Sequence, residues 1–410
     1  MGKSLSYRHT RIASYIGYVT QAIINNLAPL LFVTFNTRLN ISVEKLGLLV
    51  SVNFGIQILV DFLAARYILK IGYRKGAVLA HILCTTGLVL LGILPGVMRN
   101  AYSGLIIAIA FSALGGGLLE VLVSPIVESL PGDEKASAMS LLHSFYCWGH
   151  VAVVLLSTLY FRLAGIENWR FLPILWAVVP FMNTFLFAKV PLCSLSGDEE
   201  GHAFRRLFSS KVFWILFLLM VCAGASEQAM SQWSSMFAEA GLGISKTLGD
   251  LLGPCAFAVM MGLGRLCYGI WGSRLKIAQA LLCSALLCMV CYLLAIFSSS
   301  PVLSLVACAF TGLSVALMWP GTFSLAAQNY ATGGTAMFAI LALAGDLGCS
   351  CGPGLVGWIA GVSQRSDSSF LKYLCVNDGI KTGLLAGVIF PLLMILGIVL
   401  LRRFKLRRAS

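Results

Sequence analysis

The chain has 410 residues, of which 59% are hydrophobic and only 11% are charged, and its mean hydropathy is +0.89. An ordinary soluble protein carries roughly 25% charged residues, and a disordered chain is far less hydrophobic, so both classes are excluded. The 29 Lys and Arg residues exceed the 16 Asp and Glu residues by 13 charges, which in a soluble protein would indicate nucleic acid as a partner. Here the basic residues lie between long apolar blocks, and these blocks determine the class.

The predicted elements are helices that cross a membrane. Such a helix needs about 20 mostly apolar residues, because the hydrocarbon layer is ~30 Å thick and a helix rises ~1.5 Å per residue. An all-α membrane protein with twelve transmembrane helices is therefore the predicted fold class. The predicted spans are residues 12–36, 46–69, 76–97, 102–127, 136–164, 169–190, 212–238, 248–272, 277–298, 301–327, 334–362 and 380–401.

The positions of the basic residues predict the orientation, because Lys and Arg are enriched in cytoplasmic loops. With the N-terminus placed in the cytoplasm, 20 of the 29 basic residues fall on that side. We therefore expect a multi-pass protein of the plasma (inner) membrane with both termini cytoplasmic, and the charge requires no nucleic acid. The first apolar stretch contains Asn25 and Asn26 and is too long for a cleavable signal peptide, so it is counted as a span.

The two halves of the chain show internal similarity. Ile71 to Arg74, after the second span, aligns with Trp271 to Arg274, after the eighth, at an offset of 200 residues. Phe111 to Gly115 aligns with Phe310 to Ser314 at an offset of 199. Two matches that agree on one offset predict two six-helix repeats separated by a cytoplasmic loop. The predicted organisation is an N-terminal half at residues 1–190, a linker loop at 191–211 and a C-terminal half at 212–410.

Two parallel six-helix repeats resemble the architecture of the major facilitator superfamily, in which the substrate lies at the midplane between the repeats. The loops after Gly72 and Gly272 are similar to the short basic loops of that superfamily. Three positions before each glycine, where the superfamily has an acidic residue, this chain has Leu69 in the first half and Gly269 in the second. Gly264-Arg265 in span 8 fits the superfamily pattern better. The resemblance implies a secondary transporter, not an enzyme, with spans 1, 4, 7 and 10 around a central cavity.

Ionisable side chains inside the spans are candidate functional residues, because each costs roughly 3 kcal/mol or more in hydrocarbon. Glu120 in span 4 and Glu227 in span 7 lie on helices that the resemblance places along the pathway, and they are the candidates for proton coupling. Either glutamate could instead belong to a structural network. Gating or structural roles are expected for Asp61, Arg74, Arg265 and Asp346.

Amide and aromatic side chains on the same helices are the candidates for binding the solute. Amides and carboxylates form hydrogen bonds with hydroxyl groups, and an indole stacks on the apolar face of a sugar ring. The set would therefore suit a neutral polyhydroxylated ligand, although Trp319 before Pro320 could equally be ordinary packing. The candidate substrate-binding residues are Asn25, Asn26, Gln228, Gln232, Trp233 and Trp319.

Three short motifs carry a closer resemblance. Gly116 to Pro125 is similar to the span-4 signature of the fucose permease branch, where a glycine-rich run leads to Leu-Glu and then to Asn-Pro. Here Ser124-Pro125 replaces the Asn-Pro pair. Asn25-Asn26-Leu27 in span 1 also resembles that branch, as does Glu227 followed six residues later by Trp233.

The branch resemblance implies a mechanism for Glu120, because the span-4 glutamate of that branch takes part in proton-coupled sugar uptake. The branch also carries a span-1 aspartate at the position where this chain has Pro29. Whether Glu227 supplies the second acid, and whether the cargo differs, both stay open.

The expected function is secondary active transport, with proton-coupled uptake of a sugar or similar small polar solute by alternating access. The alternative is a proton-coupled exporter of drugs or amphipathic metabolites, but Cys147 to Val151 lacks the Gly-Pro motif that such antiporters often carry in span 5. A membrane-embedded enzyme or sensor is the third hypothesis. His143 and His150, seven residues apart with no adjacent acid, are weak metal ligands.

The remaining expectations concern cofactors and partners. We find no nucleotide-binding glycine loop and expect neither a cofactor nor a metal. Eleven of the 13 cysteines lie in predicted spans, where a free thiol behaves as a small apolar group. The expected partners are a sugar-like solute, protons and the lipid bilayer, with no nucleic acid, and the resemblance implies a monomer.

Overall fold

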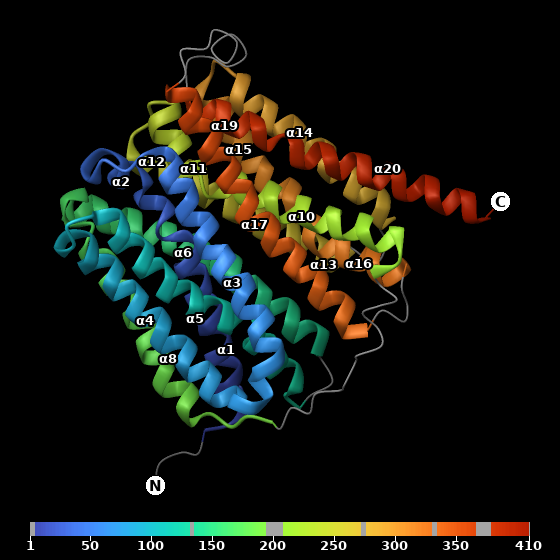
Figure 1. Cartoon of the computed structure of the whole chain (residues 1–410), viewed down its shortest axis with the longest axis horizontal. Helices are drawn as coiled ribbons and strands as arrows, with labels where there is room; N and C mark the ends of the chain where they lie inside the picture. Colours follow the sequence, from blue (N-terminus) through green and yellow to red (C-terminus); the bar gives the residue numbers. More distant parts are fainter. Residues whose placement is uncertain are drawn as a thin grey trace. The chain divides into compact units, whose positions relative to one another are not determined.

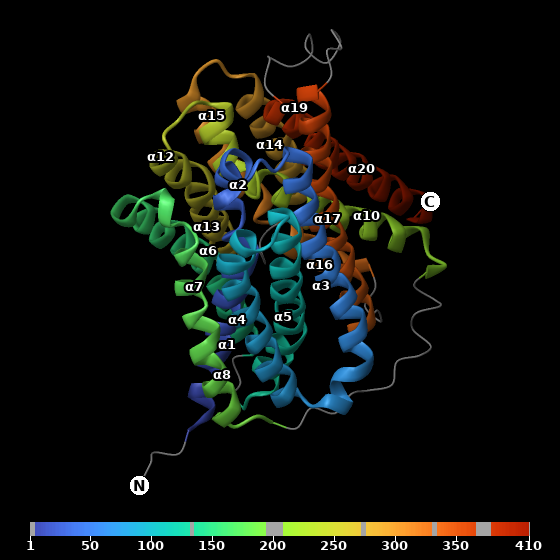
Figure 2. The same ribbon diagram turned by 60° about the vertical axis from the view of Figure 1, so that its left-hand side comes forward.

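The computed structural model describes residues 5–131, 135–193, 208–271, 276–329, 334–365 and 379–409, and every regular element in these ranges is a helix (Figures 1 and 2). Twelve segments of the described chain are long and apolar enough to cross a membrane, which confirms the predicted spans. No limit differs from its prediction by more than five residues. The spans are Tyr7–Leu39, Val43–Ala64, Tyr73–Val97, Ala101–Ser129, Leu141–Ala164, Phe171–Lys189, Lys211–Gly241, Lys246–Tyr268, Ile277–Phe297, Pro301–Asn329, Ala339–Gln364 and Gly379–Arg403.

The chain divides into two compact units. The first contains Met1–Ile41 and Val52–Asp198, and the second contains Ser42–Ser51 and Glu199–Ser410. The elements of the first unit are α1 (Tyr7–Asn26), η1 (Pro29–Leu31), α2 (Phe32–Leu39), most of α3 (Val43–Ile71), α4 (Tyr73–Val97), α5 (Ala101–Ser129), α6 (Lys135–Ala164), η2 (Ile166–Asn168), α7 (Phe171–Trp176) and α8 (Val178–Lys189).

Local sequence explains the limits of α1. The backbone N–H of Ser6 donates to Nδ1 of His9 at 3.0 Å, so the helix begins about one turn before the apolar run. At the other end Pro29 has no N–H to continue the α-helical ladder, and the short 3₁₀ segment η1 begins at that residue. Span 1 is therefore two helices, α1 and α2, joined at Pro29.

Helix α4 lies along α5 in both views of the first unit (Figures 1 and 2). Small residues allow this approach. A Cβ at Gly115 would lie 2.5 Å from the carbonyl oxygen of Ala80, and a Cβ at Gly87 would lie 2.4 Å from the backbone nitrogen of Ser112. Backbones meet here without intervening side chains, which is the usual way that helices associate where the surroundings are as apolar as the side chains.

The second unit contains the other six spans, several of them interrupted. The tenth span breaks between α15 and α16, one π-helical segment ends the seventh span, and another lies within the eighth. Single π-helical turns are frequent at functional sites. Its elements are α10 (Lys211–Ser231), α11 (Ser234–Met236), η3 (Phe237–Gly241), α12 (Lys246–Asp250), η4 (Leu251–Cys255), α13 (Ala256–Trp271), α14 (Ile277–Phe297), α15 (Pro301–Val315), α16 (Met318–Asn329), α17 (Gly334–Arg365), α19 (Gly379–Gly387) and α20 (Ile389–Ala409).

The first residues of α3 group with the second unit because they pack on α17. The hydroxyls of Ser51 and Ser350 each donate to the other residue's carbonyl oxygen, at 2.9 and 3.0 Å. A Cβ at Gly47 would lie 2.9 Å from the Cα of Gly357. Glycine and serine therefore make this helix pair tight.

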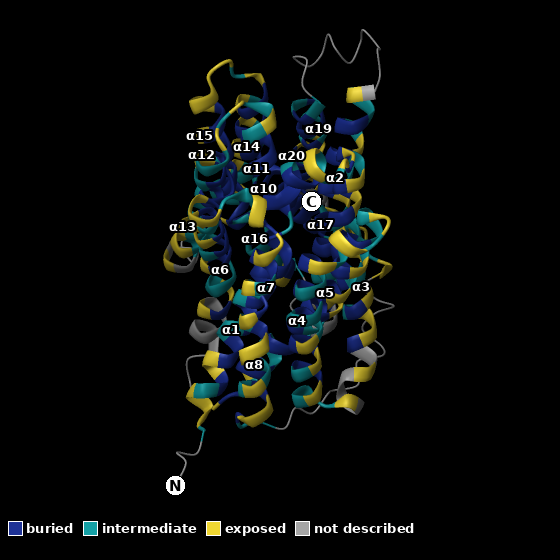
Figure 3. Ribbon diagram, turned by 90° about the vertical axis from the view of Figure 1, so that its left-hand side faces the viewer, coloured by how far each residue is buried: buried dark blue, intermediate teal, exposed yellow. Residues whose placement is uncertain are grey.

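Large apolar side chains cover the outside of the helices. Figure 3 shows exposed residues along α8, and among them Phe181, Met182 and Phe185 are 45–57% exposed. Such side chains are costly to expose to water but neutral towards lipid, so they suit a helix that borders the hydrocarbon layer.

Candidate functional site

Glu120 on α5 and Gln21 on α1 form a polar pair inside the first unit. The Nε2 of Gln21 donates to Oε2 of Glu120 at 2.6 Å. Gln21 is only 4% exposed, and Glu120 is half-buried. The ion pairs recorded in the described part of the chain do not include Glu120. The carboxyl group is therefore held by a neutral amide, and no recorded cation neutralises it.

The α1 residues next to this pair, three and four positions before Gln21, lie on the same face of the helix as Gln21. Tyr18, three residues before Gln21, shares a 2.8 Å hydrogen bond with the hydroxyl of Ser124, four residues after Glu120. A Cβ at Gly17 would lie 3.3 Å from the nearest atom of α5, so α1 and α5 pack closely here. The two hydrogen bonds thus join the same pair of helices about one turn apart.

Asn25 and Asn26, both predicted to bind the solute, are buried and hydrogen-bonded within the first unit. Oδ1 of Asn25 accepts bonds of 3.0 Å from Asn53 and Gln57 on α3. Nδ2 of Asn26 donates to the carbonyl oxygen of Ala22 at 2.9 Å. These bonds tie α1 to α3 and close the last turn of α1, so both amides hold the helix in place.

Four side chains of the second unit form a continuous polar chain along α10. Nε2 of Gln232 donates to Oε1 of Gln228 at 2.9 Å, and Nε2 of Gln228 donates to Oε1 of Glu227 at 3.2 Å. Arg265 on α13 completes the chain through an ion pair of 3.2 Å with Oε2 of Glu227. Glu227 thus differs from Glu120, because a guanidinium neutralises its charge.

The two tryptophans predicted to contact the solute have different surroundings. Trp233 is 0% exposed, and its Nε1 donates to the carbonyl oxygen of Pro353 on α17 at 3.0 Å, so its indole is enclosed in helix packing. Trp319 on α16 is half-buried. A Cβ at Gly345 would lie 2.1 Å from the Trp319 ring, so this ring lies directly on the backbone of α17. Asp346, the next residue along α17, is buried.

Arg74 at the start of α4 binds the end of α8. Its guanidinium donates to the carbonyl oxygens of Phe187, Ala188 and Val190 at 3.1, 2.8 and 2.8 Å. A cation at a helix C-terminus satisfies carbonyls that have no intrahelical partner and complements the helix dipole. These bonds favour a structural role for Arg74 over a gating role.

Asp61 on α3, for which the sequence also predicts a gating or structural role, is half-buried. The side chain of Arg66, five residues later on the same helix, lies outside the described residues.

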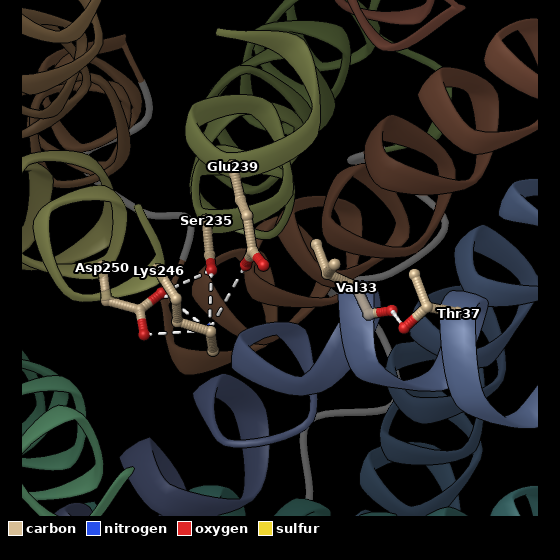
Figure 4. Close-up of polar contacts among 6 residues, drawn as sticks. All are labelled: Val33, Thr37, Ser235, Glu239, Lys246 and Asp250. Atoms are coloured by element: carbon tan, nitrogen blue, oxygen red, sulfur yellow. Dashed lines mark hydrogen bonds and ion pairs between the residues drawn. The ribbon is translucent and has the colours of Figure 1, made fainter. Parts of the chain in front are cut away.

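A cluster that sequence reasoning missed lies where the seventh and eighth spans meet (Figure 4). Nζ of Lys246 donates to both carboxylate oxygens of Asp250, at 3.0 and 2.9 Å, and lies 3.9 Å from Glu239. The hydroxyl of Ser235 donates to Asp250 at 2.5 Å. The i, i+4 spacing of Lys246 and Asp250 was the available signal. Figure 4 also draws Thr37 on α2, whose hydroxyl donates to its own helix at 2.8 Å.

A second missed cluster joins three helices of the first unit. His81 on α4 is fully buried, and its Nδ1 lies 2.7 Å from the carbonyl oxygen of Ala77. Nδ2 of Asn183 on α8 lies 2.8 Å from Nε2 of His81 and donates to the carbonyl oxygen of Ala13 on α1 at 2.9 Å. Both residues were visible as polar groups within predicted spans, but no sequence motif relates positions so far apart.

Comparison with solved structures shows which proteins share this fold. The crystal structure of a D-xylose–proton symporter is similar with a TM-score of 0.74 at 15% identity, covering 95% of this chain and 97% of that one. A bacterial homologue of the human lysosomal transporter Spinster, inward-facing and occupied, gives 0.73 at 13% identity and 98% of both chains. The fucose–proton symporter of E. coli gives 0.64 at 16% identity, with 95% of this chain and 98% of that one covered.

These similarities do not single out the fucose permease branch that the short motifs resemble. The xylose symporter and the Spinster homologue fit with higher TM-scores at similar identity. A search of curated protein sequences finds no match. The family model described as Major Facilitator Superfamily matches residues 14–353. The chain therefore belongs to the Major Facilitator Superfamily and is a secondary transporter of small solutes, not an enzyme.

Proposed function

We propose that this transporter takes up a sugar or similar small polar solute together with protons, by alternating access of its two repeats. Two of the three structures compared above are named as sugar–proton symporters, and the intramembrane polar groups of this chain suit a hydroxylated solute. The excess of Lys and Arg in the predicted inner loops supports cytoplasmic termini.

The observation that carries the proposal is the difference between the partners of Glu120 and Glu227. A carboxylate inside the hydrocarbon region needs a compensating positive charge. Glu227 receives it from Arg265 at 3.2 Å, whereas Glu120 has the neutral amide of Gln21 at 2.6 Å. A proton is therefore the natural counter-charge for Glu120, and binding and release of this proton would couple transport to the proton gradient.

Glu227 then has a role other than proton coupling, so we do not assign it as the replacement for the span-1 acid that Pro29 displaces. A glutamate paired with an arginine retains its charge and orients its neighbours, so we assign Glu227 to the polar chain with Gln228 and Gln232. The coupling proton is carried by Glu120 alone.

The solute is bound by hydrogen-bonding amides and one aromatic surface. Asn25, Asn26, Gln228 and Gln232 supply amide groups, and each can exchange a present hydrogen bond for one to a solute hydroxyl. The half-buried indole of Trp319 supplies the flat apolar surface on which a sugar ring stacks. Trp233 is fully enclosed, so we assign it to packing.

Proteoliposomes that contain a pH-sensitive dye test this proposal. Addition of sugars from a panel should cause proton entry with the cognate solute, and an imposed inward proton gradient should drive its accumulation. Glu120→Gln should abolish both effects while it preserves solute exchange without a gradient, because the polar bond to Gln21 remains possible. Glu227→Gln should leave proton entry coupled to solute entry.

Two results would contradict the proposal. Accumulation by Glu120→Gln that equals the unmodified protein would exclude Glu120 as the proton carrier. Drug resistance of cells that express the protein, without uptake of any sugar, would instead identify the exporter that the sequence leaves as the alternative.

A further inference from the structure

We propose that Gln21 is the positioning residue that stabilises both protonation states of Glu120 and so determines its affinity for the proton. The inference deepens the proposed function and rests on the assignment of proton exchange to Glu120. It concerns a residue that none of the sequence motifs singles out.

The geometry places the amide nitrogen of Gln21 against the carboxyl group. Gln21 is 4% exposed, and its Nε2 donates to Oε2 of Glu120 at 2.6 Å. Its Oε1 is buried and has no hydrogen-bond partner in the described part of the chain. A buried amide oxygen without a partner is unusual, because such a group loses its bond to water on burial. The site therefore holds one unused acceptor beside a group that can become a donor.

A carboxylate and a carboxylic acid need opposite partners. The carboxylate only accepts hydrogen bonds, whereas the acid also has an O–H that must donate. Proton uptake from water forms this O–H bond at a Glu120 oxygen. A half-turn of the Gln21 amide then replaces its N–H with Oε1, which accepts the new O–H. The amide itself neither gains nor loses a proton, so the exchange is reversible and one side chain serves both states.

Several titratable side chains on the helices around α5 form hydrogen bonds to groups other than Glu120. On α1, Tyr18 bonds to Ser124, and on α6, Tyr146 bonds to Asn26. On α4, His81 bonds to Ala77 and Asn183. Other titratable groups on these elements include Tyr15 on α1, Asp61 on α3, Cys84 on α4, and His143, Cys147 and His150 on α6. The recorded hydrogen bonds of the described residues join Glu120 to Gln21.

Infrared titration of the purified protein in lipid tests the inference without any solute. The band of the protonated Glu120 carboxyl is identified as the one that Glu120→Gln removes. Gln21→Met keeps the length of the side chain but removes both donor and acceptor. The charged state loses the stronger, charge-assisted bond. We expect the midpoint of the band to move to higher pH by about one unit, a tenfold change in proton affinity.

Two further variants keep the test sharp. Gln21→Asn retains an amide but shortens the side chain by one methylene, so it should shift the midpoint in the same direction even if Gln21→Met does not fold. Gln57→Met is the matched control, because Gln57 is also a buried glutamine with an unpartnered Oε1, but it bonds to Asn25. It should leave the Glu120 midpoint in place.

The outcomes separate the two proposals. A midpoint moved by the Gln21 variants and not by Gln57→Met supports the inference. If the Glu120 band titrates with the same midpoint in the unmodified protein and in both Gln21 variants, the inference fails while the proton-exchange role of Glu120 stands. If no band that titrates is lost in Glu120→Gln, then the proton-exchange role and the inference both fail.

Discussion

Replacement of Glu227 by Gln measures what the ion pair with Arg265 contributes to the second unit. The two charged groups are 3.2 Å apart, and only 8% of the Glu227 side chain and 24% of the Arg265 side chain are exposed. At an effective dielectric constant of 20, Coulomb's law gives an attraction of about 5 kcal/mol at this distance. Removal of one partner of a buried pair costs about 3–5 kcal/mol, because the other charge stays buried. The exposed part of Arg265 can turn towards a more polar surrounding, so we expect about 3 kcal/mol.

The assay is the free energy of unfolding, measured by denaturant titration of the purified protein in detergent micelles. Glu120→Gln is the matched control, since it is the same substitution at an acid whose recorded partner is an amide. It should cost less than about 1 kcal/mol, because one hydrogen bond changes and no charge loses its partner. The double variant Glu227→Gln with Arg265→Met should recover most of the loss, because both buried charges are then absent.

Two results would refute this reasoning. The first is a loss in Glu227→Gln no larger than that in Glu120→Gln. The second is a double variant as unstable as the single one, which would mean that Glu227 contributes through its shape or through Gln228 and not through its charge.

Three further predictions concern packing, a helix end and pH. Gly348→Ala should lower the free energy of unfolding by about 2 kcal/mol, because its Cβ would lie 2.0 Å from a carbonyl oxygen of α10. Gly116→Ala is the control and should be tolerated, because its Cβ would have no neighbour nearer than 3.6 Å. Arg74→Met should cost about 2 kcal/mol in the same assay, since three carbonyls of the α8 terminus lose a charged donor. The hydrogen bond from Arg38 lowers the pKa of the Glu167 carboxyl, so the pair's contribution is complete above about pH 4.3 and is lost as pH falls through the lowered pKa. Glu167→Gln should remove that acid-side dependence from the melting temperature and change little at neutral pH, as expected for an exposed pair.

The candidate site shows how far residue types and spacing can lead. Glu120 and Glu227 were both identifiable as acids inside predicted spans, because the cost of a charge in hydrocarbon applies wherever the helix packs. Their difference was not visible, because it depends on partners 99 and 38 residues away along the chain. Gln21 lay in the predicted first span, but an amide is not conspicuous until the carboxyl beside it is known.

Trp233 shows the opposite case. Its place six residues after Glu227 matched a family pattern, and an indole suits a sugar ring. The structure places this indole between helices, with its N–H bonded to Pro353. A side chain on a buried helix has neighbours on every side, so sequence position cannot tell a packed indole from one that faces a solute.

The sequence by itself determined the twelve spans, because the length and hydropathy that a membrane requires are properties of continuous segments. It also indicated the superfamily, through the predicted repeat and its loops, and the family model confirms that superfamily. Only the tertiary structure decided which polar side chains pair: Glu120 with an amide, Glu227 with a guanidinium, and Asp250 with Lys246. Pairing depends on distances between helices, and packing sets those distances through glycines whose contacts lie on other helices.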